Sequence, residues 1–126
     1  MVDYLSEAWL AAPVDPLAEA FAANGGSGTI ARIVTKAPDG EVRFTAVVSD
    51  GGVRYAMGTA ADADVSFTDT YANALAILRG ELDPNAAFMR GATKVTGPTG
   101  LLLDVIAASR SDVFRSACAR ALGETA

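Results

Sequence analysis

Residues 79–103 read R-G-E-L-D-P-N-A-A-F-M-R-G-A-T-K-V-T-G-P-T-G-L-L-L. Asp83-Pro84 is a strong signal for the start of a helix, because the aspartate side chain accepts hydrogen bonds from free backbone N–H groups and proline lacks the N–H that would be unpaired. Gly91 marks the end of that helix. The stretch therefore predicts a short helix, then a brief strand over 92–96, and then a turn that opens another helix.

Four segments upstream of this stretch have the character of β-strands. The first is rich in β-branched residues, and in the other three apolar residues alternate with more polar ones, a period of two that is typical of strands that bury one face. The segments are 29–36, 42–48, 53–57 and 63–67. Turn residues at 38–40 and 50–52 separate the first three segments. We therefore expect the four segments to form an antiparallel meander that is covered on one face.

Helical spacing of apolar residues appears on both sides of these strands. Between residues 2 and 23 the spacing is broken by Pro13 and Pro16, which predicts two short helices that meet near residues 12–15. After the strands, residues 68–70 and Ser111 offer N-cap oxygens to two further helices. Helices are thus expected before and after a block of strands.

Length and charge limit the domain count and the partners. The 126 residues fit one domain, 1–126, which we divide into N-terminal helices at 1–27 and a core domain at 28–126. The net charge of −5 argues against nucleic acid and against anionic membranes as partners. No run approaches the ~20 apolar residues that span a bilayer, so stable membrane insertion is not expected. The single cysteine, Cys118, indicates a reducing, cytoplasmic location.

The absence of histidine excludes several kinds of catalytic site. It removes Ser-His and Cys-His nucleophile pairs and every histidine-containing metal site. With one cysteine, a thiolate zinc site is also excluded within one chain, so we expect no metal and no cofactor. Asp64, Asp69 and Asp104 are the best remaining catalytic candidates, but solvated or helix-capping roles are expected for them. The sequence predicts no catalytic residues and a protein that is not an enzyme.

The stretch from Ala63 to Leu103 resembles the sterol carrier protein family in content and order. The resemblance rests on the strand A-D-V-S-F-T at 63–68, the L-R-G that ends the next helix at 78–80, and the string at 79–103. A weaker agreement extends back to about Thr29. The resemblance implies an α+β fold, with a mainly antiparallel sheet of about five strands and helices on one face that enclose an apolar cavity.

The resemblance also implies which side chains line that cavity and contact a ligand. The residues are Phe44, Val65, Phe67, Leu75, Leu78, Phe88, Met89, Leu101, Leu102, Val105 and Ile106. Phe88 and Met89 are expected to point inward from the short helix, and a flexible thioether suits a surface that accepts varied ligands. Each of these residues fits an ordinary hydrophobic core equally well.

The function that follows is lipid binding and lipid transport. Members of the family carry fatty acids, fatty acyl-coenzyme A, sterols or phospholipids, so the expected partner is one apolar small molecule in an internal tunnel. The alternative is a protein interaction or dimerisation module on the same fold, either a homodimer or an accessory to a lipid-metabolising enzyme. The N-terminal helices fall outside the matched part, and three roles are open for them: to plug the cavity, to cover the sheet or to form a dimer.

Overall fold

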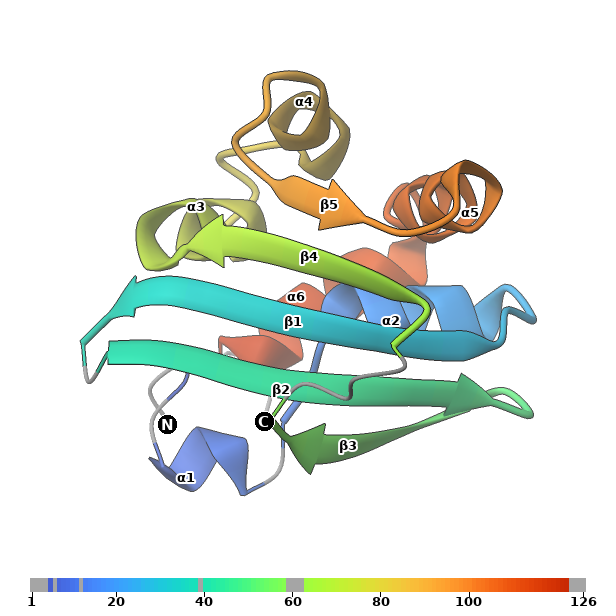
Figure 1. Cartoon of the computed structure of the whole chain (residues 1–126), viewed down its shortest axis with the longest axis horizontal. Coiled ribbons are helices and arrows are strands. Elements are labelled where there is room, and N and C mark those ends of the chain that lie inside the picture. Colours follow the sequence, from blue (N-terminus) through green and yellow to red (C-terminus); the bar gives the residue numbers. More distant parts are fainter. Residues whose placement is uncertain (1–4, 6, 12, 39, 59–62, 123–126) are drawn as a thin grey trace.

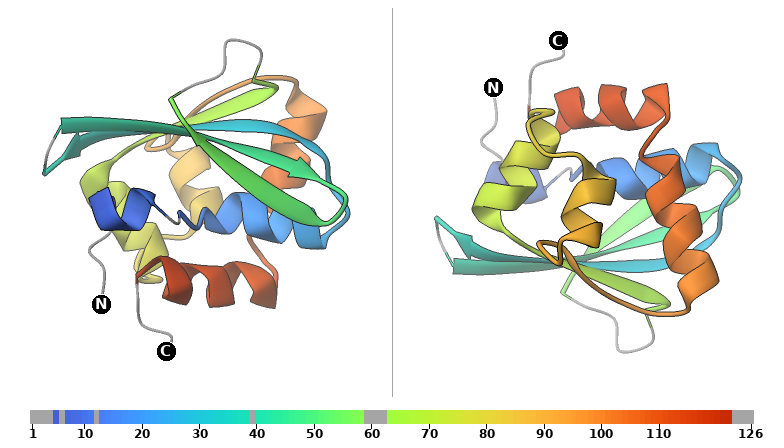
Figure 2. Two further views of the ribbon diagram at one scale, coloured as in Figure 1. Left: turned by 90° about the horizontal axis from the view of Figure 1, so that it is seen from below. Right: turned by 90° about the horizontal axis from the view of Figure 1, so that it is seen from above.

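The structure of the protein is a computed structural model that describes residues 5, 7–11, 13–38, 40–58 and 63–122. It is an α+β fold in which one five-stranded sheet carries the helices on one face (Figures 1 and 2). The strands are β1 Gly28–Ala37, β2 Gly40–Ser49, β3 Gly52–Met57, β4 Val65–Thr70 and β5 Lys94–Thr96. The helices are α1 Glu7–Leu10, α2 Pro16–Ala23, α3 Tyr71–Leu78, α4 Pro84–Met89, α5 Thr99–Ala108 and α6 Asp112–Ala121. The predicted fold class is confirmed.

The first three strands form the predicted antiparallel hairpins. β1 pairs with β2, and β2 pairs with β3. The loop between β2 and β3 consists of Asp50 and Gly51, whose φ angles are 52° and 77°. Two consecutive positive φ values match the twist of a two-residue hairpin, and aspartate followed by glycine is a preferred pair for this turn. The sequence therefore identified this hairpin from local chemistry alone.

The prediction of a four-strand meander is wrong for β4. The strand order is β3-β2-β1-β4-β5, so β4 pairs with β1 on the side away from β2. That pairing is parallel and runs from Ile30 opposite Val65 to Thr35 opposite Thr70. An alternating pattern shows which side chains of a strand share a face, but it does not identify the neighbouring strand. β5 then pairs antiparallel with β4, which leaves the sheet mostly antiparallel.

The helix starts follow the predicted capping residues. Asp83 accepts a hydrogen bond from the N–H of Ala86 at 3.0 Å at the start of α4. Thr70 and Ser111 cap α3 and α6 in the same way. Each cap satisfies one of the N–H groups that have no partner within the helix.

The N-terminal helices cover the sheet. Trp9 of α1 is buried, its ring packs edge-on against Phe44 of β2, and its Nε1–H donates to the carbonyl oxygen of Ala121 at 2.8 Å. α2 packs against α5 and α6 on one side and against β2 and β3 on another. Of the three roles left open by the sequence, the structure shows that these helices cover the sheet, and the other two stay predictions.

Gly97 fits the turn between β5 and α5 against β4. Its φ is +133°, and a Cβ atom placed there would lie 2.7 Å from the carbonyl oxygen of Asp64 and 2.7 Å from a methyl group of Val65. A side chain at this position would clash with β4 and strain the backbone. The glycine thus allows α5 to start close to the sheet.

Candidate functional site

An apolar cavity lies between the sheet and the helices. It receives side chains from β1, β2 and β4 and from each of the six described helices, and its volume is about 30 Å³. The lining residues are Trp9, Val14, Asp15, Pro16, Leu17, Arg32, Phe44, Phe67, Asp69, Ala74, Ile77, Leu78, Pro84, Phe88, Thr93, Ile106 and Phe114. Apart from one aspartate pair, one arginine and one threonine, this lining is apolar. The volume accommodates one or two water-sized groups and no lipid tail.

The structure brings part of the predicted ligand-contacting set to this cavity. The predicted residues in its lining are Phe44, Phe67, Leu78, Phe88 and Ile106. Val65, Leu102 and Val105 are buried in the surrounding core, while Leu75 and Leu101 are partly buried against it. Contact with a ligand stays a prediction for all ten residues.

The predicted inward orientation of Met89 is wrong. The side chain of Met89 is 81% exposed, whereas Ala87, two residues earlier in α4, is fully buried. Successive residues of a helix are separated by about 100° around its axis, so a short helix that packs on one face turns some of its apolar residues to solvent. Phe88 lies on the packed side of α4 and Met89 does not.

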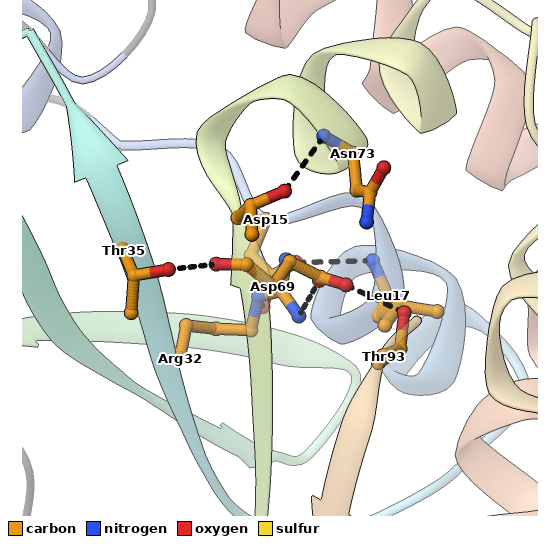
Figure 3. A network of polar contacts seen from close by, with 8 residues as sticks. Asp15, Leu17, Arg32, Thr35, Asp69, Asn73 and Thr93 are labelled. Carbon is orange, nitrogen blue, oxygen red and sulfur yellow. Dashed lines mark hydrogen bonds and ion pairs between the residues drawn. The ribbon is translucent and has the colours of Figure 1, made fainter. Parts of the chain in front are cut away.

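A buried charge cluster forms the polar end of the cavity. Arg32 of β1 lies between two carboxylates, and all three residues are less than one-tenth exposed. The guanidinium Nη1 lies 3.3 Å from Oδ2 of Asp69, and Nε lies 3.7 Å from Oδ2 of Asp15. The guanidinium carbon also lies 6.0 Å from the centre of the Phe67 ring. Figure 3 shows the cluster where β1 and β4 meet the segment before α2.

The two carboxylates differ in their hydrogen bonds. Asp69 Oδ1 accepts a 2.5 Å hydrogen bond from the hydroxyl of Thr93, and Asp69 Oδ2 pairs with Arg32 (Figure 3). Asp15 Oδ1 accepts from the N–H of Leu17 at 3.3 Å, as the N-cap of α2. In the part of the chain that the structure describes, Asp15 Oδ2 is buried and has no hydrogen-bond partner. Asp15 is therefore the carboxylate with an open acceptor in the cavity.

The surroundings of Asp15 favour its neutral form. Burial raises the pKa of Asp15 above its ordinary value, and the positive charge of Arg32 counteracts this only in part. The hydroxyl of Tyr55 accepts a hydrogen bond from the N–H of Asp15 at 2.9 Å and donates to Glu19 at 2.7 Å. Burial also raises the pKa of Tyr55, with the carboxylate of Asp15 as the next cause. Two carboxyl groups, those of Asp15 and Asp69, thus share the single guanidinium of Arg32.

Sequence reasoning missed this cluster, and its expectation for Asp69 is wrong. Asp69 is buried, and the cap of α3 is the hydroxyl of Thr70, so Asp69 is neither solvated nor a helix cap. Asp64 and Asp104 are exposed, as expected. The signal was present in the alternation of the strands: Arg32 shares its face of β1 with Ile30 and Val34, which are buried. A charged residue on a buried face needs a partner of opposite charge.

A second, open cleft lies on the outside of the helical layer. Its volume is about 640 Å³, and it is lined by residues 77–84, from the end of α3 to the start of α4, by Ser109 and by one side of α6. Four residues line both this cleft and the inner cavity: Ile77, Leu78, Pro84 and Phe114. These four side chains are therefore a partition between the cavity and the cleft.

Among residues 5, 7–11, 13–38, 40–58 and 63–122, no three aspartate, glutamate, cysteine or histidine side chains come together as ligands of a metal ion. No helix in these same residues is both long and apolar enough to cross a membrane.

Comparison with solved structures shows what the fold is similar to. A conserved hypothetical protein of Thermus thermophilus has a TM-score of 0.65 and 23% identity over 96% of this chain and 91% of that chain. The sterol carrier protein domain 2 of Helicoverpa armigera has a TM-score of 0.57 and 23% identity, over 92% and 84% of the two chains. Palmitated SCP2L2 from Aedes aegypti has a TM-score of 0.58 and 21% identity, over 83% and 87%.

Comparison of the sequence itself gives the family. No curated protein matches the chain significantly. The family that matches is the SCP-2 sterol transfer family, over residues 7–109. The match begins within α1, which is earlier than the start near Thr29 that the sequence resemblance implied. The chain belongs to the SCP-2 sterol transfer family.

Proposed function

We propose that the chain is a non-catalytic lipid-binding domain that holds one apolar small molecule between the sheet and the helices. The observation that carries the proposal is the apolar cavity beneath the sheet, whose lining includes Phe44, Phe67 and Phe88. A ligand gains roughly 25 cal/mol for each Å² of apolar surface that leaves water, so such a lining binds a lipid tail without any pattern of hydrogen bonds. Family membership supports the same function.

The site must widen to admit a lipid tail. A volume of about 30 Å³ is far smaller than the ~300–1,000 Å³ of ordinary ligand pockets. The partition of Ile77, Leu78, Pro84 and Phe114 separates the cavity from the open cleft by a single layer of side chains. Movement of the α3–α4 connection, which contains Gly80 with a φ of +77°, would join the two spaces. We therefore place the route of access at this partition.

The widened site would include more of the predicted residues. Val65, Leu75, Leu101, Leu102 and Val105 form part of the hydrophobic cluster around the cavity and would come into contact with a longer ligand. Met89 is not part of this proposal, because its side chain faces solvent. The palmitate in the structure of the Aedes aegypti protein supports a fatty acyl chain as one ligand class, beside the sterols and acyl-coenzyme A of the sequence-based expectation.

The small volume also favours a second candidate, an interaction module whose interior is filled by its own side chains. In that case the chain would act through a homodimer or through a lipid-metabolising enzyme. Met57, Met89 and Leu103 are more than half exposed and are apolar side chains that such a partner could cover. For either function we propose a cytoplasmic location, on the ground of the single cysteine.

Trp9 provides the measurement that separates these functions. It is the only tryptophan of the chain and it lines the cavity, so a ligand that enters should change its fluorescence. We expect saturable changes on titration with a fatty acid, an acyl-coenzyme A, a fatty alcohol or a sterol. No change with any of these, together with a concentration-dependent dimer, would favour the interaction module.

A matched pair of variants on α3 controls for indirect effects. Ala74→Leu places a larger side chain in the cavity, because Ala74 is 3% exposed and lines it. Ala72→Leu makes the same change on the exposed side of the same helix. Binding should weaken in Ala74→Leu and persist in Ala72→Leu, provided that circular dichroism shows both variants to be folded. Equal binding by both variants would place the ligand elsewhere.

A further inference from the structure

We propose that Asp15 makes the cavity selective for a neutral, hydroxyl-bearing apolar ligand over the corresponding ionised carboxylate. This inference rests on the proposed function, because it concerns the headgroup of a ligand whose tail occupies the apolar part of the same cavity. The site is the buried cluster of Asp15, Arg32 and Asp69 at the polar end of the lining.

The hydrogen bonds of the cluster identify Asp15 as the group that meets the ligand. Asp69 Oδ1 accepts a hydrogen bond from the hydroxyl of Thr93, and Asp69 Oδ2 lies 3.3 Å from Nη1 of Arg32, whereas Asp15 Oδ2 lies 3.7 Å from Nε of Arg32. Asp15 is 2% exposed and lines the cavity, and its Oδ2 has no hydrogen-bond partner in the described part of the chain. A buried polar atom without a hydrogen bond loses free energy that a ligand group can restore. Oδ2 of Asp15 is therefore the atom that recognises a headgroup.

A hydroxyl group suits this atom in either protonation state of Asp15. A hydroxyl can donate to an ionised carboxylate and can accept from a protonated one. It is also small enough, because the cavity of about 30 Å³ exceeds the ~10–15 Å³ that a water molecule needs. The existing space thus accepts the headgroup, and only the tail requires the side-chain partition to move.

A carboxylate headgroup meets an unfavourable charge at the same place. The cluster holds two carboxyl groups around one guanidinium. Another buried anion next to Asp15 is stable only if one of the two takes up a proton, as with any pair of carboxylates that share a site. Arg32 does not remove this difficulty, because it already faces both Asp15 and Asp69.

The test compares 1-dodecanol with dodecanoate near neutral pH, with Trp9 fluorescence as the readout. The two probes share one tail and differ in the headgroup. We expect the alcohol to bind the wild type at least about tenfold more tightly than the carboxylate, a ratio that corresponds to the net gain from one hydrogen bond. Equal affinity for the two probes, or tighter binding of dodecanoate, would overturn the proposal.

Two substitutions of equal charge then locate the effect. Asp15→Asn removes the ionisable carboxyl group at the open position, keeps an N-cap side chain for α2, and supplies an N–H donor to a carboxylate. Asp69→Asn makes the same replacement on the other side of Arg32 and leaves Asp15 in place. We expect Asp15→Asn to reduce the preference to about threefold or less, through tighter dodecanoate binding, and Asp69→Asn to retain most of the preference.

The outcomes separate this inference from the proposed function. Loss of the preference in both variants would show that the net charge of the cluster decides, and would overturn the assignment to Asp15. Binding of neither probe to folded wild-type protein would contradict the proposed function itself. If Asp15→Asn does not fold, the wild type and Asp69→Asn still test the proposal. Loss of the preference for 1-dodecanol in Asp69→Asn would contradict the assignment of this preference to Asp15.

Discussion

Replacing Arg32 with methionine removes the positive charge from the buried cluster while retaining much of the stem of the side chain. Asp15 and Asp69, each 2% exposed, would then be buried without their counter-charge. Removing one partner of a buried ion pair commonly lowers the free energy of unfolding by about 3–5 kcal/mol. We expect Arg32→Met to fall in this range near neutral pH, which is a large part of the ~5–15 kcal/mol that stabilises an ordinary domain.

Urea unfolding, followed by the fluorescence of the buried Trp9, measures this loss. Arg43→Met is the matched control, because Arg43 pairs with Glu41 at the surface and both side chains are more than 40% exposed. A surface pair contributes less than about 1 kcal/mol. The difference between the variants should shrink in acid, because burial raises the pKa of Asp15 and its protonated form needs no counter-charge. If Arg32→Met loses no more stability than Arg43→Met, the argument that Arg32 balances the cluster is refuted.

Three other positions give independent checks. Burial raises the pKa of Asp15 above 3.8, so the stability that Asp15 contributes relative to asparagine should fall as pH rises from 3.8 through the raised pKa. Urea unfolding of the wild type and of Asp15→Asn at a series of pH values measures this change. Gly97→Ala should lower the free energy of unfolding by about 1–3 kcal/mol, since its Cβ would meet the carbonyl oxygen of Asp64. Gly100→Ala is the control and should not lower the free energy of unfolding, because the space around Gly100 is open. Equal losses in both variants would contradict the clash. Burial raises the pKa of Cys118 from 9.0 to about 12. Its reaction with a thiol reagent near neutral pH should therefore be roughly 1,000-fold slower in the folded protein than in urea. A rate in the folded protein close to that of the unfolded chain would contradict this burial.

The parts of the fold that depend on local chemistry could be predicted from the sequence. Asp83-Pro84 starts α4, and Asp50-Gly51 closes the β2–β3 hairpin, because capping and turn geometry need only neighbouring residues. The position of β4 could not be predicted in this way. Its parallel pairing with β1 joins segments about 35 residues apart, and the alternating pattern of β4 fits an antiparallel neighbour equally well.

The residues that the sheet contributes to the candidate site could be predicted from the sequence, but most of those that the helices contribute could not. Phe44 and Phe67 line the cavity because alternation places them on the buried face of β2 and β4. Trp9 reaches the same cavity from α1, but no short-range pattern indicates that this helix returns to the sheet. Met89 was misplaced because six residues of α4 are too few to define an apolar face. The partnership of Arg32 with Asp15 and Asp69 depends on three separate elements, so it appears only in the folded chain.

The most direct test of the central claim is native mass spectrometry of protein purified without detergent, followed by organic extraction and mass analysis of what is bound. A lipid-binding domain should carry one apolar molecule per chain, or should take one up when fatty acids, fatty alcohols, acyl-coenzyme A and sterols are offered. A population at the bare mass of the chain, unchanged after exposure to every one of these compounds, would contradict the lipid-binding account.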